Sequence, residues 1–316
     1  MLTKVAVVQA PPVFLDRSAT VAHVCERMAE AAANGASLVV FPEAYIPGYP
    51  AWVWRLKPAG DRALSGEIHS RLREQAVDLA RGDLAPICKA AATHGLTVVC
   101  GMHELDSEFS GATLFNTVVI IDPEGTVLNR HRKLMPTNPE RMVWGLGDAR
   151  GLRVVNTPAG RIGTLICWEN YMPLARYALY AQQLEVLVAP TWDCGDEWFV
   201  SMRHIAREGG CWVIGTGTAI ETRDVPASFP GREQLFPQDE WLCEGGAVVV
   251  RPFGKIEAGP LNCDKGTLYA EIEPAAAPRS RRSLDVTGHY ARPDIFHLTV
   301  NQAPMAPVTF TDGGTS

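Results

Sequence analysis

Three residues with complementary chemistry each follow an apolar segment that is typical of a β-strand. Cys167 comes after the run 162–166 and before a segment with helical periodicity, Glu43 follows Pro42 at the end of another apolar run, and Lys133 ends the segment 126–133. A thiol needs a base and a nearby cation to become a good nucleophile at neutral pH. A carboxylate can take the thiol proton, and an ammonium can stabilise negative charge on the atom that is attacked. The trio therefore predicts nucleophilic catalysis through Cys167.

The positions of these residues give them a way to meet. In α/β proteins, ligands gather at the carboxyl ends of the strands, so side chains that follow three strands can converge although they are far apart in the chain. A strand-to-helix junction at Cys167 also places the thiol beside the backbone N–H of Trp168, where an anion is favoured. Each residue has a structural alternative: a buried inert thiol, a solvated or capping glutamate, and a lysine in a surface charge run.

Strand and helix patterns alternate along nearly the whole chain, which indicates an α/β protein with helices covering its sheets. We expect one domain over residues 1–280, built as two halves, and a polar tail over 281–316. The expected strands lie at 5–10, 37–41, 96–102, 113–122, 126–133, 152–155, 162–166, 186–190, 211–216, 246–250 and 267–273. The expected helices lie at 19–34, at 63–94 with a break near Gly82 and Pro86, from the Cys167 junction to Gln183, and at 197–208.

Composition excludes several classes of protein. The 316 residues are 47% hydrophobic, enough for a large core, and the formal net charge is −6 with scattered Lys and Arg, which argues against nucleic-acid binding. The sequence lacks a membrane-spanning apolar run and a signal peptide, and its eight cysteines show no close pairing, so we expect a cytoplasmic protein with free thiols. Neither a phosphate-binding glycine loop nor a pair of histidines at metal-binding spacing occurs, so neither a cofactor nor a metal is expected.

Long strings around these residues resemble the nitrilases of the carbon–nitrogen hydrolase superfamily. The resemblance extends over nearly the whole chain and is carried by VAVVQAPPVFLD (5–16), FPEAYIPGYP (41–50), HRKLMPTNPERMVWGLGD (131–148), ICWENYMPLAR (166–176), VAPTWD (188–193) and GHYARPDIF (288–296). It implies a four-layer αββα sandwich and a homodimer that extends this sandwich, with higher spiral assemblies in many members. It also implies a small-molecule nitrile as substrate, converted to a carboxylic acid and ammonia through thioimidate and thioester intermediates.

The family's catalytic set matches Glu43, Lys133 and Cys167, and a second glutamate of superfamily sites matches Glu140. Glu140 is either a further acid or base or a group that positions Lys133 by a charge-assisted hydrogen bond. Glu169, just past the nucleophile, is expected to orient either the helix start or the substrate.

Six aromatic residues surround the motifs, and core packing is the alternative for each of them: Tyr49, Trp52, Trp54, Trp144, Trp168 and Trp192. Tyr49, Trp168 and Trp192 are the candidates for substrate binding. An amidase or a cyanide-hydrolysing enzyme with the same Glu-Lys-Cys site, and a non-catalytic scaffold in which Cys167 is an ordinary thiol, remain alternatives.

Overall fold

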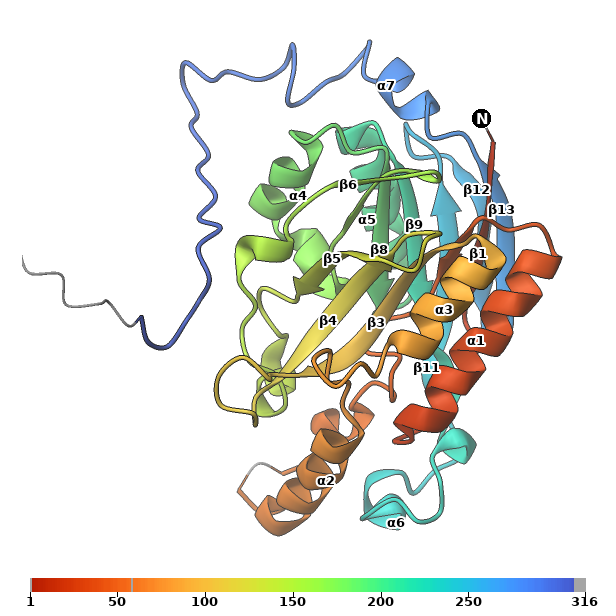
Figure 1. The fold of residues 1–316 in the computed structure, drawn as a ribbon, viewed down its shortest axis with the longest axis vertical. Helices are drawn as coiled ribbons and strands as arrows, with labels where there is room; N and C mark the ends of the chain where they lie inside the picture. Colours follow the sequence, from red (N-terminus) through yellow and green to blue (C-terminus); the bar gives the residue numbers. More distant parts are fainter. Residues whose placement is uncertain (1, 58, 310–316) are drawn as a thin grey trace, which may run out of the picture.

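The computed structural model describes residues 2–57 and 59–309 and contains two β-sheets packed face to face, with helices on both outer faces (Figure 1). This is the αββα sandwich that the family resemblance implies. In the described residues, no helix is long and apolar enough to cross a membrane.

The first sheet has six strands in the order β13-β1-β2-β3-β4-β5. Its centre, β1 to β3, is parallel, and the flanking strands β13, β4 and β5 each pair antiparallel with their neighbours. The strands are β1 Thr3–Val8, β2 Leu38–Val40, β3 Thr97–Leu105, β4 Leu114–Ile121, β5 Val127–Arg132 and β13 Thr267–Ile272.

The second sheet has seven strands, in the order β10-β11-β9-β8-β7-β6 with β12 paired to β11. Here β7, β8 and β9 are parallel and the other pairs are antiparallel. The strands are β6 Val155–Thr157, β7 Gly160–Thr164, β8 Val186–Thr191, β9 Trp212–Gly217, β10 Ala219–Glu221, β11 Trp241–Val250 and β12 Ile256–Asn262.

Alternation along the strands explains the layers. In β1, Val5 and Val7 face the second sheet in a shared core with Ile162 and Val188, whereas Ala6 and Val8 face the helices on the other side. Helices α1 (Arg17–Ala33) and α3 (Ala85–His94) cover the first sheet, and α4 (Pro173–Tyr180) and α5 (Asp196–Gly209) cover the second. Both sheets are buried on both faces, which explains why their central strands are continuously apolar.

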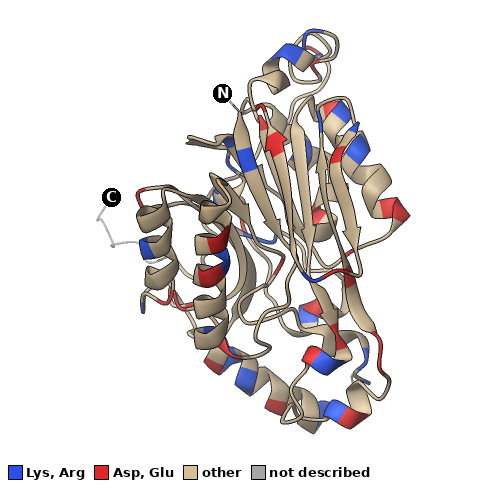
Figure 2. Cartoon of the chain, turned by 90° about the vertical axis from the view of Figure 1, so that its right-hand side faces the viewer, with Lys and Arg blue, Asp and Glu red and all other residues tan. Residues whose placement is uncertain are grey.

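Shorter elements lie at the ends of the sandwich. Helices α2 (Arg62–Gln75) and α6 (Arg232–Leu235) project from one end, and α7 (Ala276–Ser280) follows the last strand (Figure 1). The 3₁₀ helices are η1 Ala51–Trp54, η2 Asn138–Met142, η3 Ala149–Gly151, η4 Cys167–Tyr171 and η5 Thr222–Asp224. On the face shown in Figure 2, acidic and basic residues alternate along the helices while the strands are mostly uncharged.

Some details differ from the sequence-based expectation. Strands β10 and β12 were not expected, since β10 has three residues and β12 is a largely exposed strand that contains Gly259 and Pro260. Pro86 does not break a helix but stands in the first turn of α3, where its missing N–H costs no hydrogen bond. After α7, residues 281–309 contain neither helix nor strand, and the Met305 N–H reaches back to Asp148.

One close approach fixes the loop that carries Glu43. A Cβ atom at Gly101 of β3 would lie 2.8 Å from the Ala44 nitrogen and would overlap the Pro42 carbonyl. We predict that Gly101→Ala lowers the free energy of unfolding in urea by about 1–3 kcal/mol, the usual cost of overpacking. Gly66→Ala is the matched control: it lies in α2 with open space around it, and should raise stability by about 0.5–1 kcal/mol. Equal effects of the two substitutions would contradict the steric argument.

Candidate active site

The three residues singled out by the sequence lie at the carboxyl-end edge of the sandwich, as expected. Glu43 follows β2, Lys133 follows β5, and Cys167 follows β7. Regular backbone pairing continues almost to each of them: the Lys133 N–H donates to Asn116 O at 2.7 Å, and the Leu165 N–H donates to Val188 O at 3.3 Å. The sheets therefore hold the site residues on rigid backbone.

A buried ammonium lies between two buried carboxylates at this edge. Lys133 Nζ donates to Glu43 Oε1 at 2.7 Å and to Glu140 Oε2 at 2.8 Å, and all three side chains are at most 1% exposed. Asn116 Nδ2 also donates to Glu43 Oε1 at 2.7 Å. The other oxygen of Glu43, Oε2, has no hydrogen-bond partner among the described residues. One oxygen of Glu43 is thus held firmly, and the other is available to accept a proton.

Glu140 is held by three hydrogen bonds. Besides Lys133, the Tyr49 hydroxyl donates to Oε1 at 2.7 Å and the Thr137 N–H donates to Oε2 at 2.7 Å. Of the two roles left open for Glu140, this geometry supplies the charge-assisted hydrogen bond to Lys133 directly.

Cys167 occupies a strained turn. It begins η4 with a φ of 52°, in the left-handed region that is unfavourable for residues other than glycine. Asn170 Nδ2 stabilises the turn by donating to the carbonyls of Leu165 and Cys167, at 2.9 and 2.8 Å. The Thr191 hydroxyl donates to Cys167 Sγ at 3.2 Å, and the Trp168 N–H has no partner within residues 2–57 and 59–309. The turn therefore presents the thiol next to a free N–H at the start of a helix.

Glu169 ties the cysteine turn to the lysine segment. Its carboxylate accepts the Ile166 N–H and the Leu134 N–H, each at 2.6 Å, and lies 2.9 Å from His131 Nε2. Leu134 directly follows Lys133, so one carboxylate fixes both chain segments relative to each other. This agrees with the expectation that Glu169 orients the helix start.

Burial and the two carboxylates control the protonation of the site. Burial raises the pKa of Glu43 to about 7, although the Lys133 charge opposes that rise. Burial and the Glu43 charge raise the pKa of Cys167 to about 12, against the influence of Lys133. Burial would lower the pKa of Lys133, but the charges of Glu43, Cys167 and Glu140 outweigh it and raise that pKa. Lys133 thus favours the thiolate, as expected of a nearby cation, but burial and the Glu43 charge outweigh its influence.

The thiol opens onto a cavity of about 150 Å³ with aromatic walls. Its lining comprises Tyr49, Trp54, Thr137, Glu140, Cys167, Trp168, Trp192 and Asp193. Tyr49 and Trp192 stack with ring centres 4.1 Å apart, while Trp54 and Trp168 are about half exposed. Trp168 Nε1 donates to Asp193 Oδ2 at 2.8 Å, which holds that indole at the opening.

Two of the six aromatic candidates do not line this cavity. Trp52 packs in the core against Phe14 and Phe229, and Trp144 is buried with its indole N–H bonded to His103 Nδ1. Sequence reasoning also missed four polar residues at the site: Asn116, Thr137, Thr191 and Asp193. Thr191 and Asp193 lie at and after the end of β8, so the strand-end argument used for Glu43 would have found them.

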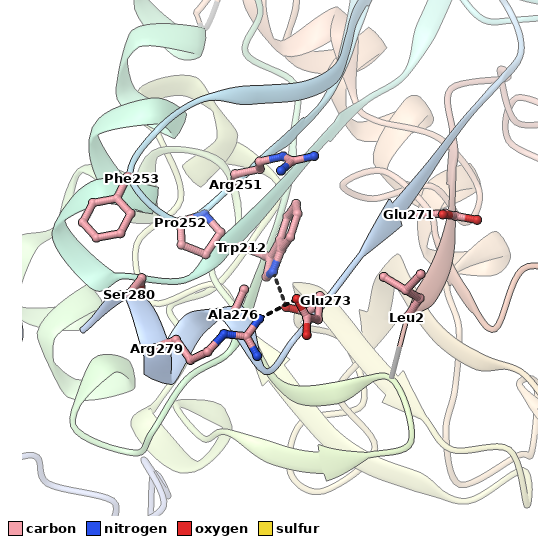
Figure 3. Close-up of a pocket in the computed structure, with 10 residues that line it drawn as sticks. All are labelled: Leu2, Trp212, Arg251, Pro252, Phe253, Glu271, Glu273, Ala276, Arg279 and Ser280. Atoms are coloured by element: carbon pink, nitrogen blue, oxygen red, sulfur yellow. Dashed lines mark hydrogen bonds and ion pairs between the residues drawn. The ribbon is translucent and has the colours of Figure 1, made fainter. Parts of the chain in front are cut away.

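A larger cavity, of about 430 Å³, lies away from the cysteine at the amino-terminal ends of the parallel strands (Figure 3). Trp212 Nε1 donates to Glu273 O at 2.8 Å there, and Arg279 pairs with the Glu273 carboxylate. No thiol lines this cavity. The smaller cavity at Cys167 is therefore the candidate active site. In the described residues, no group of three or more His, Cys, Asp or Glu side chains is placed to hold a metal ion.

Known proteins resemble this chain in sequence and in fold. The carbon-nitrogen hydrolase family model matches residues 4–282. An aliphatic nitrilase of Sinorhizobium fredii (strain HH103) is 40% identical over 306 residues, covering 96% of this chain and 97% of the relative. A bifunctional nitrilase/nitrile hydratase of Nicotiana tabacum is 39% identical over 313 residues, covering 98% of this chain and 88% of the relative.

A solved carbon-nitrogen hydrolase from Helicobacter pylori G27 shares the fold, with a TM-score of 0.70 at 19% identity over 93% of this chain and 97% of that one. The sequence matches extend over the segments that carry Glu43, Lys133 and Cys167, and the fold brings these residues together. The chain therefore belongs to the carbon–nitrogen hydrolase family, with the nitrilases as its relatives.

Proposed function

We propose that this protein hydrolyses an organic nitrile to the carboxylic acid and ammonia, with Cys167 as the nucleophile. The observation that carries the proposal is the arrangement of the Cys167 thiol beside a carboxylate with one free oxygen and a compensated ammonium. The nitrilase relatives support the substrate class.

The first step couples proton transfer to bond formation. Because the pKa of the thiol lies well above that of Glu43, little thiolate exists beforehand, and the proton moves to Glu43 Oε2 as Sγ attacks the nitrile carbon. Negative charge develops on the nitrile nitrogen, where Lys133 Nζ and the Trp168 N–H can stabilise it. Glu43 passes the thiol proton on to that nitrogen, which leaves a thioimidate on Cys167 and returns Glu43 to its carboxylate form.

Two waters complete the reaction. Glu43 takes a proton from the first water, which adds to the thioimidate carbon and forms a tetrahedral intermediate. Loss of ammonia leaves a thioester, and the second water releases the acid and the thiol, so that R–C≡N and 2 H₂O give R–COOH and NH₃. If the sulfur leaves first, an amide is released instead. The product ratio depends on whether the nitrogen or the sulfur is the better protonated and stabilised leaving group.

The aromatic cavity suits an apolar R group. We propose Tyr49, Trp168 and Trp192 as the residues that contact it, and Glu43, Lys133, Cys167 and Glu140 as the catalytic set. The competing activities are hydrolysis of an amide or of cyanide at the same site. Ammonia release from nitrile, amide and cyanide substrates separates them, and turnover of amide without turnover of nitrile would refute the nitrilase proposal.

A homodimer and higher spiral assemblies are part of the proposal. Exposed apolar side chains on and beside α4 and α5 support an interface between copies there: Tyr171, Met172, Leu174 and Val200. The division into a domain over 1–280 and a tail over 281–316 also stays a prediction.

Replacement of the nucleophile tests the covalent mechanism. We predict that Cys167→Ala abolishes nitrile turnover, measured as ammonia release, and leaves the circular dichroism spectrum unchanged because the volume lost is small. Cys211→Ala is the matched control, since Cys211 is also fully buried but lies at the opposite end of the parallel strands. Turnover retained by Cys167→Ala would refute Cys167 as the nucleophile, and absence of turnover in the unmodified protein would favour the scaffold alternative.

The base should control the pH profile. Glu43 accepts a proton only as a carboxylate, so kcat/KM should fall as the pH drops through about 7, where Glu43 becomes protonated. This fall is the acidic limb of the pH profile. Glu43→Gln should remove the acidic limb and lower kcat by about 10²–10⁴-fold, the usual contribution of a general base. A profile that stays flat well below neutral pH in the unmodified protein would exclude Glu43 as the base.

Loss of the Asn116 hydrogen bond should shift the acidic limb of kcat/KM in a known direction. This hydrogen bond stabilises the carboxylate form of Glu43 and so lowers the pKa of that group. We therefore predict that Asn116→Leu, which removes the donor at similar volume, moves the acidic limb of kcat/KM to higher pH. An unchanged limb would mean that this hydrogen bond does not influence the base.

A further inference from the structure

We propose that Trp54, Tyr49 and Glu140 form a hydrogen-bonded relay from the cavity opening to Lys133, and that Tyr49 acts as a positioning residue that sets the ratio of acid to amide. The inference deepens the proposed function and depends on it for its product readout. It gives the Tyr49 hydroxyl a role separate from that of its ring, which forms part of the cavity wall.

The relay is continuous and has one direction. Trp54 Nε1 donates to the Tyr49 hydroxyl oxygen at 3.1 Å, that hydroxyl donates to Glu140 Oε1 at 2.7 Å, and Glu140 Oε2 accepts from Lys133 Nζ at 2.8 Å. An indole N–H can only donate and an ionised carboxylate can only accept, so the hydroxyl proton must point to Glu140. Trp54 is 48% exposed and Glu140 is 1% exposed, so the relay joins the opening to the buried ammonium.

The rings are held by packing as well as by hydrogen bonds. Tyr49 stacks on Trp192 and meets Trp144 edge-on at 5.8 Å between ring centres. Burial and the nearby Glu140 charge raise the pKa of Tyr49 well above its usual range, so the phenol keeps its proton throughout the working pH range. Tyr49 is therefore a permanent donor to Glu140.

Loss of this donor has a definite electrostatic consequence. Without the hydroxyl, Glu140 Oε1 would be a buried carboxylate oxygen with no donor, so the carboxylate would no longer be held in its position beside Lys133. Its negative charge would then act less strongly on the site. A more positive site makes the nitrogen of the tetrahedral intermediate harder to protonate and the departing sulfur anion easier to stabilise. Both effects favour release of amide over release of ammonia.

The same change alters two titrations. The Glu140 charge raises the pKa of Glu43 and the pKa of Cys167, so a Glu140 carboxylate that is no longer held beside Lys133 leaves both pKa values lower. The other titratable groups that face the relay are Lys133, Asp193 at the cavity and His103 behind Trp144. Burial lowers the pKa of His103 to about 3, so that ring stays neutral.

Two further charged side chains lie on or next to the elements that carry the relay, and each of them bonds to a group outside the relay. Arg55, directly after η1, pairs with Glu240 at 2.9 Å, and Arg141 of η2 donates to Pro136 O at 3.1 Å. Glu43, Lys133 and Cys167 are thus the groups that respond when the relay is cut.

The test compares three variants with the unmodified protein. Tyr49→Phe removes the hydroxyl and keeps the ring. Trp54→Phe removes only the outer donor from a half-exposed residue, so it decides the matter if Tyr49→Phe does not fold. Tyr45→Phe is the matched control, because Tyr45 lies on the same loop and its buried hydroxyl donates to Pro11 O, away from the relay.

We expect Tyr49→Phe to raise the amide-to-acid ratio by about two- to tenfold, the range of one hydrogen bond. The acidic limb of kcat/KM should move to lower pH, opposite to Asn116→Leu. The alkylation rate of Cys167 by iodoacetamide at a fixed alkaline pH, followed by mass spectrometry of its peptide, should rise. Trp54→Phe should change all three in the same direction by less, and Tyr45→Phe should change none.

The proposal would be overturned if Tyr49→Phe altered only KM and left the product ratio, the acidic limb of kcat/KM and the alkylation rate unchanged. Tyr49 would then be only a part of the cavity wall. If the unmodified protein hydrolyses no nitrile, the proposed function fails by itself. The alkylation rates still decide whether the relay exists, because they need no turnover.

Discussion

The Lys133 ammonium lies between the carboxylates of Glu43 and Glu140, with all three side chains withdrawn from water. Loss of one partner from a buried charge group typically costs about 3–5 kcal/mol, because it leaves another charge without compensation. The cluster is therefore interdependent: each member holds the others in place. Burial, together with the Glu43 charge, keeps the neighbouring thiol protonated until substrate arrives.

Such a cluster is possible only because the fold excludes water from it. Glu43, Lys133 and Glu140 come from three separate segments, and Cys167 comes from the other sheet of the sandwich. The facing sheets share a core of aliphatic residues that fixes their spacing. Glu169 then joins the Cys167 turn to the residue after Lys133. The strain of the left-handed Cys167 is thus held by contacts on both sides of the active site.

Where the apolar pattern of a segment was strong, the sequence was sufficient to predict its secondary structure. Central strands such as β1 and β8 are apolar along their length, and α5 has a clear helical period, so their existence and approximate bounds could be predicted. The exposed β12 could not, since it has no alternation and contains a proline. Trp52 and Trp144 show the same limit for side chains, because their type and neighbours in the sequence do not distinguish a core position from a cavity wall.

The sequence by itself determined the fold class and predicted Glu43, Lys133 and Cys167 as the reactive residues, because strand-end positions and long family strings are local properties of the chain. Only the tertiary structure decided how these groups act on one another. The free oxygen of Glu43, the Asn116 and Thr191 hydrogen bonds, the Tyr49 contact with Glu140 and the protonated state of the thiol all depend on distances between segments remote in the chain. Electrostatic interactions and burial depend on those distances, and the linear sequence does not contain them.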